Sequence, residues 1–165
     1  MIFYTSITNG YDKLSAPPKS DVKFICFYDG VKPDTDGWEY IKIEIDEECP
    51  VRKSYHPKHC PHLYFDADDT TVWIDASYTI TNELIEYSKV IFDFVLQRHP
   101  DKRTLIKEFE KLYYHGFSTR DEILDMCKKI KQVKYPIKFY DQTINCAIWR
   151  RLTPEVIEWG KVWRE

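Results

Sequence analysis

Short apolar runs alternate with amphipathic helical patterns along most of the chain, and this alternation is the strongest limit on its fold. The runs are rich in β-branched and aromatic residues and end in turn-forming or acidic residues, as buried strands do. They span Ile2–Ile7, Val22–Tyr28, Trp38–Ile45, Thr71–Ile74, Val90–Leu96 and Ile144–Trp149. Strands separated by helices predict an α/β fold with a mainly parallel central sheet covered by helices on both faces.

Helical patterns dominate the second half of the chain. The first predicted helix opens at Pro100 and Asp101 and closes at Gly116, a residue typical of helix C-termini. A second starts near Thr119, and a third has Thr153 as its N-cap, followed by proline in the first turn. These signals place helices on both sides of the last predicted strand.

Length and composition favour one domain over residues 1–165, because 165 residues with 43% hydrophobic content can bury one sizeable core. The 24 basic and 27 acidic residues are interleaved and give a formal charge of −3, so we expect no nucleic-acid partner. There is no basic leader and no apolar stretch of about 20 residues, so we expect no membrane span. Five scattered cysteines favour reduced thiols in the cytoplasm, or in the host cytoplasm if the protein is viral.

Candidate functional residues gather where predicted strands end, because ligands of open α/β sheets bind at the carboxyl ends of strands. Thr5, Ser6, Asp29, Asp75 and His99 hold such positions.

Asp75 stands out among them, since a basic stretch beginning at Lys58 precedes its strand and opposite charges would converge on one edge of the sheet. A carboxylate there can bind Mg²⁺ or Mn²⁺ together with a diphosphate, and Ser77 can add a weaker neutral ligand. An aspartate that merely caps the turn after its strand explains the same position, because aspartate is common in turns.

Other chemistries find less support. A zinc site built from Cys49, His56, His59, Cys60 and His62 matches no common zinc-finger spacing, and Pro57 and Pro61 disturb the helix that would align its ligands. Phosphate contacts and loop packing explain the histidines more simply. The chain has no Gly-x-Ser-x-Gly elbow of the kind that serine hydrolases use. No Gly-x-Gly-x-x-Gly motif, which would indicate a dinucleotide-binding oxidoreductase, follows a predicted strand.

An ordered set of motifs resembles the glycosyltransferase-like domain family that includes plant turgor-regulation and seed-mucilage proteins, with similar domains in bacteria and large DNA viruses. The motifs are Phe3–Leu14, Phe24–Asp29, Pro61–Phe65, Trp73–Ser77 and Arg98–Pro100. The resemblance implies a GT-A type nucleotide-binding sandwich. It also implies an enzyme that transfers sugar from a nucleotide-diphosphate donor, most often a UDP-sugar, to a glycan, a glycoprotein or another hydroxyl acceptor with the help of Mn²⁺ or Mg²⁺.

The resemblance also assigns roles along the first half of the chain. It implies that the first strand and its loop receive the base and ribose, and that Asp29 lies at the next strand end. The residues of that first strand and loop are Thr5, Ser6, Ile7 and Tyr11. Lys58 and His62 match a basic helix before the metal strand. Asp75, Ala76 and Ser77 replace the family's metal motif, whose second acid is missing in this chain.

Three further residues are acceptor-side or catalytic candidates by the same resemblance. His99 belongs to a His-Pro step that follows a later strand, and Asp141 and Asn145 lie where the family carries an acid. The family's C-terminal Asp-Gln element would follow the last helix, so we expect the chain to be the N-terminal part, or a trimmed form, of a longer one. The missing acid and missing element leave an alternative open, namely a non-catalytic module that binds a nucleotide or a glycan with the same fold.

Overall fold

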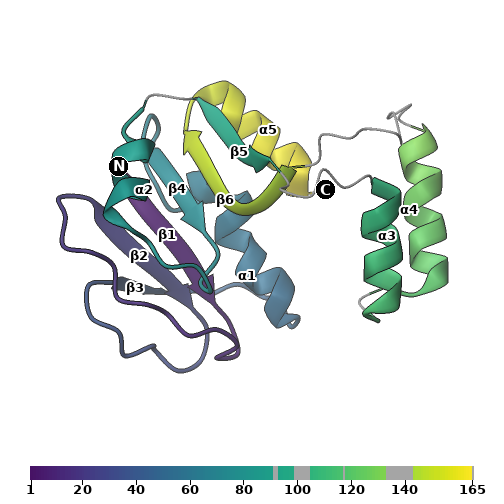
Figure 1. The fold of residues 1–165 in the computed structure, drawn as a ribbon, viewed down its shortest axis with the longest axis horizontal. Helices are drawn as coiled ribbons and strands as arrows, with labels where there is room; N and C mark the ends of the chain where they lie inside the picture. The colour runs from purple at the N-terminus through teal and green to yellow at the C-terminus, as the bar shows by residue number, and fades with distance from the viewer. Residues whose placement is uncertain (91–92, 99–104, 117, 133–142, 165) are drawn as a thin grey trace. The chain divides into compact units, whose positions relative to one another are not determined.

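The computed structural model describes residues 1–90, 93–98, 105–116, 118–132 and 143–164. Contacts divide the chain into two units, one formed by Met1–Leu96 with Cys146–Glu165 and the other by Gln97–Asn145. The first unit holds most of the sheet and the helices that cover it, and the second holds a pair of helices (Figure 1). The expectation of a single glycosyltransferase-like domain stays a prediction.

The sheet has six strands in the order β3-β2-β1-β4-β6-β5. The strands are β1 (Ile2–Ile7), β2 (Lys23–Tyr28), β3 (Glu39–Lys42), β4 (Thr70–Ile74), β5 (Phe94–Arg98) and β6 (Thr143–Arg151). The neighbours from β3 to β4 pair in parallel, whereas β6 runs antiparallel to β4. The α/β class is therefore confirmed, but the sheet is mixed, and the prediction of a parallel sheet holds for only part of it.

Strand β1 occupies the centre of the parallel part. All six of its residues are buried, which matches the continuous apolar run expected of a strand covered on both faces. It pairs with β2 from Ile2 opposite Lys23 to Ile7 opposite Tyr28, and it pairs with β4 on its other side. Residues on β1 therefore fix the position of both neighbouring strands.

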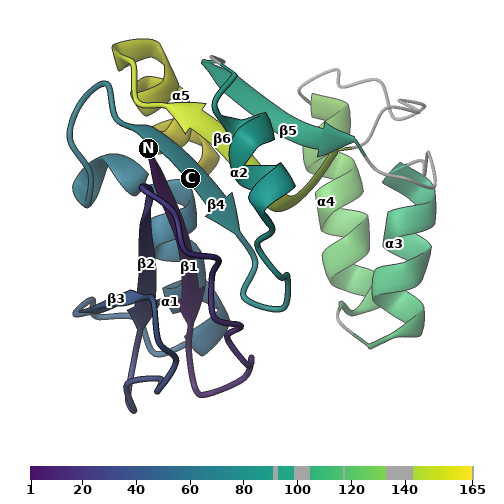
Figure 2. The same ribbon diagram turned by 60° about the vertical axis from the view of Figure 1, so that its left-hand side comes forward.

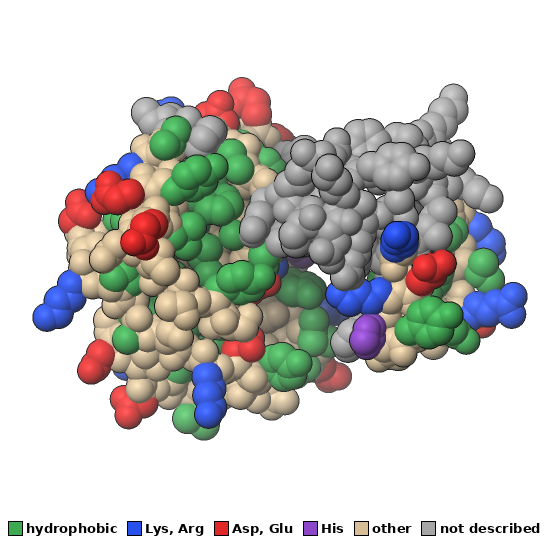
Figure 3. Space-filling model, in the orientation of Figure 1, with side chains coloured by type: hydrophobic (Ala, Val, Ile, Leu, Met, Phe, Trp, Pro, Cys, Tyr) green, Lys and Arg blue, Asp and Glu red, His purple; other side chains and the backbone are tan. Residues whose placement is uncertain are grey.

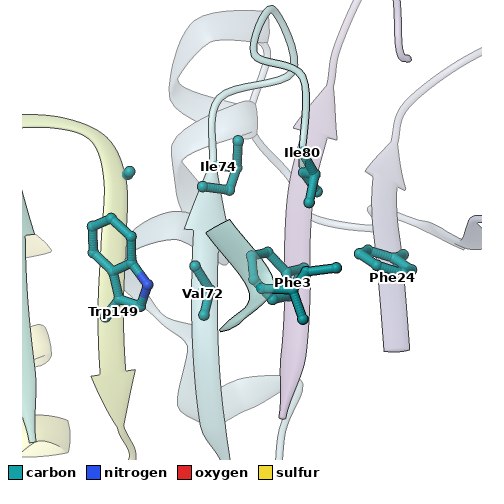
Figure 4. Packing of buried hydrophobic residues seen from close by; sticks show 8 residues of the cluster. Phe3, Phe24, Val72, Ile74, Ile80 and Trp149 are labelled. Carbon is teal, nitrogen blue, oxygen red and sulfur yellow. The ribbon is translucent and has the colours of Figure 1, made fainter. Parts of the chain in front are cut away.

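The two faces of the sheet carry separate hydrophobic clusters. On one face Phe3, Phe24, Val72 and Trp149 pack against Ile80 and neighbouring residues (Figure 4). On the other face, side chains of alternate residues such as Tyr4, Phe27, Trp73 and Ile148 pack together. Helices α1 (Pro50–His59) and α2 (Asn82–Ser88) lie on opposite faces, as Figure 2 shows.

Helix α1 was not predicted from residue patterns, because Pro57 lies inside it and its sequence is polar. Its first turn nevertheless begins with Pro50, which is well suited to a position without an intrahelical N–H bond. His56, Lys58 and His59 occupy the last turn, where basic groups complement the helix dipole. Pro57 and Lys58 are buried against the sheet, so tertiary packing compensates for weak helical propensity.

The remaining helices of the first unit are α2 and α5 (Pro154–Arg164). Helix α2 was also not predicted. Its N-cap is Thr81, whose hydroxyl accepts a bond from the Leu84 N–H, and Ser88 accepts a 2.7 Å bond from Trp149 Nε1. Helix α5 begins as predicted, because Ile157 N–H bonds to the Thr153 carbonyl, and it contacts α1.

The second unit contains α3 (Leu105–Tyr114) and α4 (Arg120–Gln132), which contact each other. The predicted stop at Gly116 is confirmed, since this residue adopts φ of 69° and its N–H bonds to the Tyr113 carbonyl. Thr119 and Glu122 bond reciprocally as a capping box before α4. The predicted opening of α3 at Pro100 and Asp101 lies outside the described residues.

We expect Phe3→Ala to lower the free energy of unfolding by about 3–5 kcal/mol, because Phe3 is fully buried at the centre of the first cluster. Urea unfolding followed by tryptophan fluorescence measures this. Val31→Ala is the matched control, since Val31 is 93% exposed and should change stability by less than about 0.5 kcal/mol. Equal losses for the two variants would contradict the central position of β1.

Candidate functional site

The carboxyl edge of the sheet contains a point where strand order reverses. Strands β2 and β3 follow β1 on one side, whereas β4, the next parallel strand, lies on the other side of β1. The loops that leave β1 and β4 therefore diverge from adjacent strand ends, which is where open α/β sheets bind ligands. Asp75 directly follows β4 at this point, and its N–H bonds to the Cys146 carbonyl at 2.8 Å.

An ion pair between Lys58 and Asp75 lies at this edge. Lys58 Nζ is 2.9 Å from Asp75 Oδ1, and Trp73 Nε1 donates a 2.7 Å bond to the same oxygen. The Lys58 side chain is only 6% exposed, whereas the Asp75 side chain is 37% exposed. The pair is thus buried on its cationic side and open to solvent on its anionic side, and the convergence of opposite charges predicted from the sequence is confirmed.

Two aromatic rings surround the Lys58 ammonium. Nζ lies 5.0 Å from the centroid of Trp73 and 5.5 Å from that of Tyr55, within the range of cation–π attraction. Burial lowers the pKa of Lys58, and the carboxylate of Asp75 opposes that shift. Asp75 and the rings therefore support a charge that burial alone would disfavour.

The position of Lys58 along the sheet is set by hydrogen bonds between β1 and α1. Ser6 Oγ donates to the Ser54 carbonyl and Thr8 Oγ1 donates to the Pro50 carbonyl, each at 2.8 Å. Ser6, predicted to contact the nucleotide, therefore uses its hydroxyl to hold α1. Thr8, which no sequence pattern singled out, does the same.

The loop after β1 is held by Asp29, which follows β2. The N–H of Asn9 bonds to Asp29 Oδ1 at 2.6 Å, and Asn9 and Gly10 both have positive φ, as a tight turn requires. The same turn presents Tyr11, whose side chain is 90% exposed. Asp29 and Tyr11, both predicted to contact the donor, are thus joined through one loop.

The other predicted site residues have varied environments. Thr5 is buried on the face opposite Ser6, and its hydroxyl finds no partner among the described residues. Ile7 and Ala76 pack together with Cys26, while Ser77 is exposed. His62 lies in a short 3₁₀ turn, Pro61–Leu63, just after α1.

The side chains of the predicted acceptor-side and catalytic residues lie outside the described part of the chain. His99 and Asp141 lie outside the described residues, and Asn145 falls in β6 with its side chain outside them. Their roles remain predictions.

Sequence reasoning assigned no site role to four residues of this region, namely Tyr55, Trp73, Tyr78 and Cys146. Trp73 and Asp75 share one face of a strand, and Tyr55 and Lys58 are three apart on a helix, so both spacings carried a usable signal. Tyr78 follows β4, and its N–H bonds to the Asp75 carbonyl. A hydrogen bond with Cys146 raises the pKa of Tyr78, a contact between segments far apart in sequence that no local pattern reveals.

The residues around Asp75 do not fit a divalent-metal centre of the kind that uses two acids. No group of three potential His, Cys, Asp or Glu ligands occurs in the part of the chain that the structure describes. Asp75 Oδ1 already accepts two donors, and an ammonium 2.9 Å away would repel a metal ion at the same carboxylate. The expectation of Mn²⁺ or Mg²⁺ at Asp75 and Ser77 stays a prediction.

A separate pocket of about 610 Å³ lies between the outer side of α1 and residues 45–47. Its lining includes Arg52, Tyr55, His56 and His59, with Asp46 and Glu47 across from them. His56 Nδ1 lies 2.6 Å from the Tyr64 hydroxyl, so this ring is anchored to the core. Tyr55 lines this pocket and also contacts Lys58, and thus lies between the pocket and the ion pair.

Comparison of the chain with known protein families, with curated proteins and with solved structures finds no match. The motif resemblance therefore has no independent support from relatives.

Acidic and basic side chains are mixed on the visible face of the first unit (Figure 3). Among the described helices, none is long and apolar enough to cross a bilayer.

We expect Asp75→Ala to lower the free energy of unfolding by about 1–3 kcal/mol, because it leaves the buried Lys58 ammonium without its counter-charge. Adding Lys58→Met to this variant should recover part of the loss, since the double variant no longer buries a lone cation. A double-mutant cycle by urea unfolding measures the coupling. Strictly additive losses would show that the pair is not coupled.

His59 should make stability fall in mild acid. Burial, helped by the charges of Lys58 and Arg150, lowers the pKa of His59 from 6.5 to about 4. Between these values the unfolded chain takes up a proton that the folded protein does not, so stability decreases as pH falls from about 6.5 toward 4.

The measurement is urea unfolding of the wild type and His59→Gln at pH 7.5 and pH 5.5. Allowing for solvent screening, the wild type should lose up to about 1 kcal/mol more than the variant. An identical loss in both proteins would exclude this assignment.

Proposed function

We propose that the chain is a glycosyltransferase domain that binds a nucleotide-diphosphate sugar of the UDP-sugar class at the carboxyl edge of β1 and β4. The observation that carries the proposal is the Lys58–Asp75 pair at the point where strand order reverses. The motif resemblance adds the class of donor, and the strand order with one antiparallel neighbour is compatible with a GT-A type sandwich.

The first strand and its loop are suited to receive the nucleoside. Tyr11 offers an exposed ring for stacking on a base, and the Asn9–Asp29 bond holds the loop that carries this ring. We assign Thr5, Ser6 and Ile7 to the floor of this site, since all three are buried. The Ser6 hydroxyl is already committed to α1, whereas the buried Thr5 hydroxyl has no partner among the described residues.

Lys58 is suited to the diphosphate, and Asp75 with Ala76 to its immediate surroundings. In the proposed reaction the oxygen of an acceptor hydroxyl forms a bond to the anomeric carbon, and the bond from that carbon to the diphosphate oxygen breaks. The electron pair leaves with the nucleoside diphosphate, and the hydroxyl proton passes to a base. Lys58 stabilises the negative charge that develops on the leaving group.

The base is not assigned among the described residues. Asp141 and Asn145 remain the candidates for the acceptor side, and His99 remains a catalytic candidate that the family places near the donor phosphates and sugar; all three come from the resemblance alone. A glycan or glycoprotein acceptor is proposed on the same ground.

A binding module without catalysis is the second candidate. It is favoured by one observation, namely that Asp75 is engaged by Lys58 and Trp73 while the position of a second acid is occupied by buried Ala76 or exposed Ser77. The glycosyltransferase and a nucleotide-binding module both predict nucleotide-sugar binding at the same edge, whereas a glycan-binding module does not. The first two differ in whether nucleotide is released.

We expect UDP-sugars to raise the melting temperature of the protein, because a ligand at about 100 times its dissociation constant stabilises the folded state by about 2.7 kcal/mol. A thermal-shift screen of nucleotide-sugars, followed by an assay for released UDP with hydroxyl acceptors, tests the proposal. Asp29→Ala should reduce the shift by freeing the Asn9 loop, and the exposed Asp36→Ala is its control. Binding without release would favour a nucleotide-binding module, and no shift with any nucleotide-sugar would reject the glycosyltransferase and leave only a module that binds a glycan.

A further inference from the structure

Two buried cations lie near each other on the face of the sheet that α1 covers. Lys58 is 5% exposed and Arg150, on β6, is 2% exposed. Their charges are close enough that Arg150 contributes to lowering the pKa of both Lys58 and His59. Buried cations normally require an anionic partner close by.

Only one carboxylate among the described residues pairs with these two cations. Asp75 pairs with Lys58, whereas the Arg150 guanidinium bonds to the Tyr4 hydroxyl, and its Nε has no partner among the described residues. Burial raises the pKa of Tyr4 to about 12, so this phenol supplies no negative charge at neutral pH. The low pKa of His59 keeps that ring neutral as well, and the described residues thus leave an excess of positive charge beside the carboxyl edge.

This excess has the sign suited to an anionic ligand, and the Asp75 carboxylate lies between the Lys58 ammonium and solvent. Lys58 has three N–H donors, of which Asp75 accepts one. The ammonium is held by Asp75 and two rings, so it needs little rearrangement to act on a charge arriving beside it. The open side of the pair, at Asp75, faces solvent.

The same arrangement opposes a divalent cation. An ion bound to Asp75 would lie within a few ångströms of the Lys58 ammonium, and no second acid among the described residues offsets this repulsion. The positive charges of Lys58 and Arg150, which would repel such a metal ion, attract a diphosphate.

We propose that Asp75 positions Lys58 instead of binding a divalent metal, and that the diphosphate of the ligand displaces the Asp75 carboxylate from the Lys58 ammonium, whose charge the buried Arg150 reinforces. This inference rests on the proposed function for the identity of the ligand, but its anion site can be tested without it. Inorganic pyrophosphate carries the same chemistry without base or sugar.

The experiment is titration calorimetry of the whole chain with UDP and with inorganic pyrophosphate, each in EDTA and in Mn²⁺. Binding in EDTA should be within about threefold of binding in Mn²⁺ and should weaken as salt increases. Lys58→Met should weaken it at least about tenfold, and Lys58→Arg should restore most of it. Lys23→Met, an exposed lysine at the opposite end of β2, is the matched control and should bind as the wild type does.

Asp75→Asn separates the positioning role from a metal-ligand role. The amide keeps an oxygen for Trp73 and Lys58 but removes a negative charge, so anion binding in EDTA should stay equal or become tighter. Binding that requires Mn²⁺ and is lost in Asp75→Asn would overturn the inference while leaving the proposed function intact. Pyrophosphate binding in EDTA without any nucleotide binding would support the inference and reject the proposed function, and absence of both would overturn both.

Discussion

The burial of β1 on both faces is the constraint on which the rest of the first unit depends. A strand without exposed residues must be paired on both edges and covered on both sides, and β2, β4, α1 and α2 meet these needs. Strand β2 pairs with one edge of β1 and β4 with the other. The loops that leave the carboxyl ends of β1 and β4 therefore diverge, and the candidate site lies between them. The candidate site is thus a consequence of how one apolar strand is buried.

Much of this could be predicted from local sequence. The run Ile2–Ile7 indicates a buried strand by composition alone, and Gly116 and Thr153 mark helix ends because their backbone and side-chain preferences are strong. Helix α1 could not be predicted in this way, since Pro57 argues against a helix and only burial of the neighbouring Lys58 against β1 compensates. The antiparallel direction of β6 was equally hidden, because pairing direction depends on the path of the chain and not on the composition of a strand.

The site shows the same division between local and non-local information. Asp75 was singled out because it follows a predicted buried strand that a basic stretch precedes, and its contact with Lys58 depends on the placement of two segments at one edge. The roles of Ser6 and Thr8 were not predictable, since a hydroxyl at a strand end can bind a ligand or a backbone carbonyl, and the position of α1 decides between these partners. Arg150 was missed because a cation within a strand of the interior contradicts the expectation that charges lie outside.

The two hydroxyl bonds between β1 and α1 have a mechanical consequence. The donors, Ser6 in β1 and Thr8 just after it, are two residues apart, and the acceptor carbonyls of Ser54 and Pro50 are four residues apart on α1. Both bonds form in the same position of the helix along the sheet. Sliding α1 by one turn, about 5.4 Å, would leave at most one of the two hydroxyls opposite a helix carbonyl and would carry Lys58 away from Asp75. The two hydroxyl bonds and the Lys58–Asp75 pair therefore agree on one alignment of α1 against the sheet.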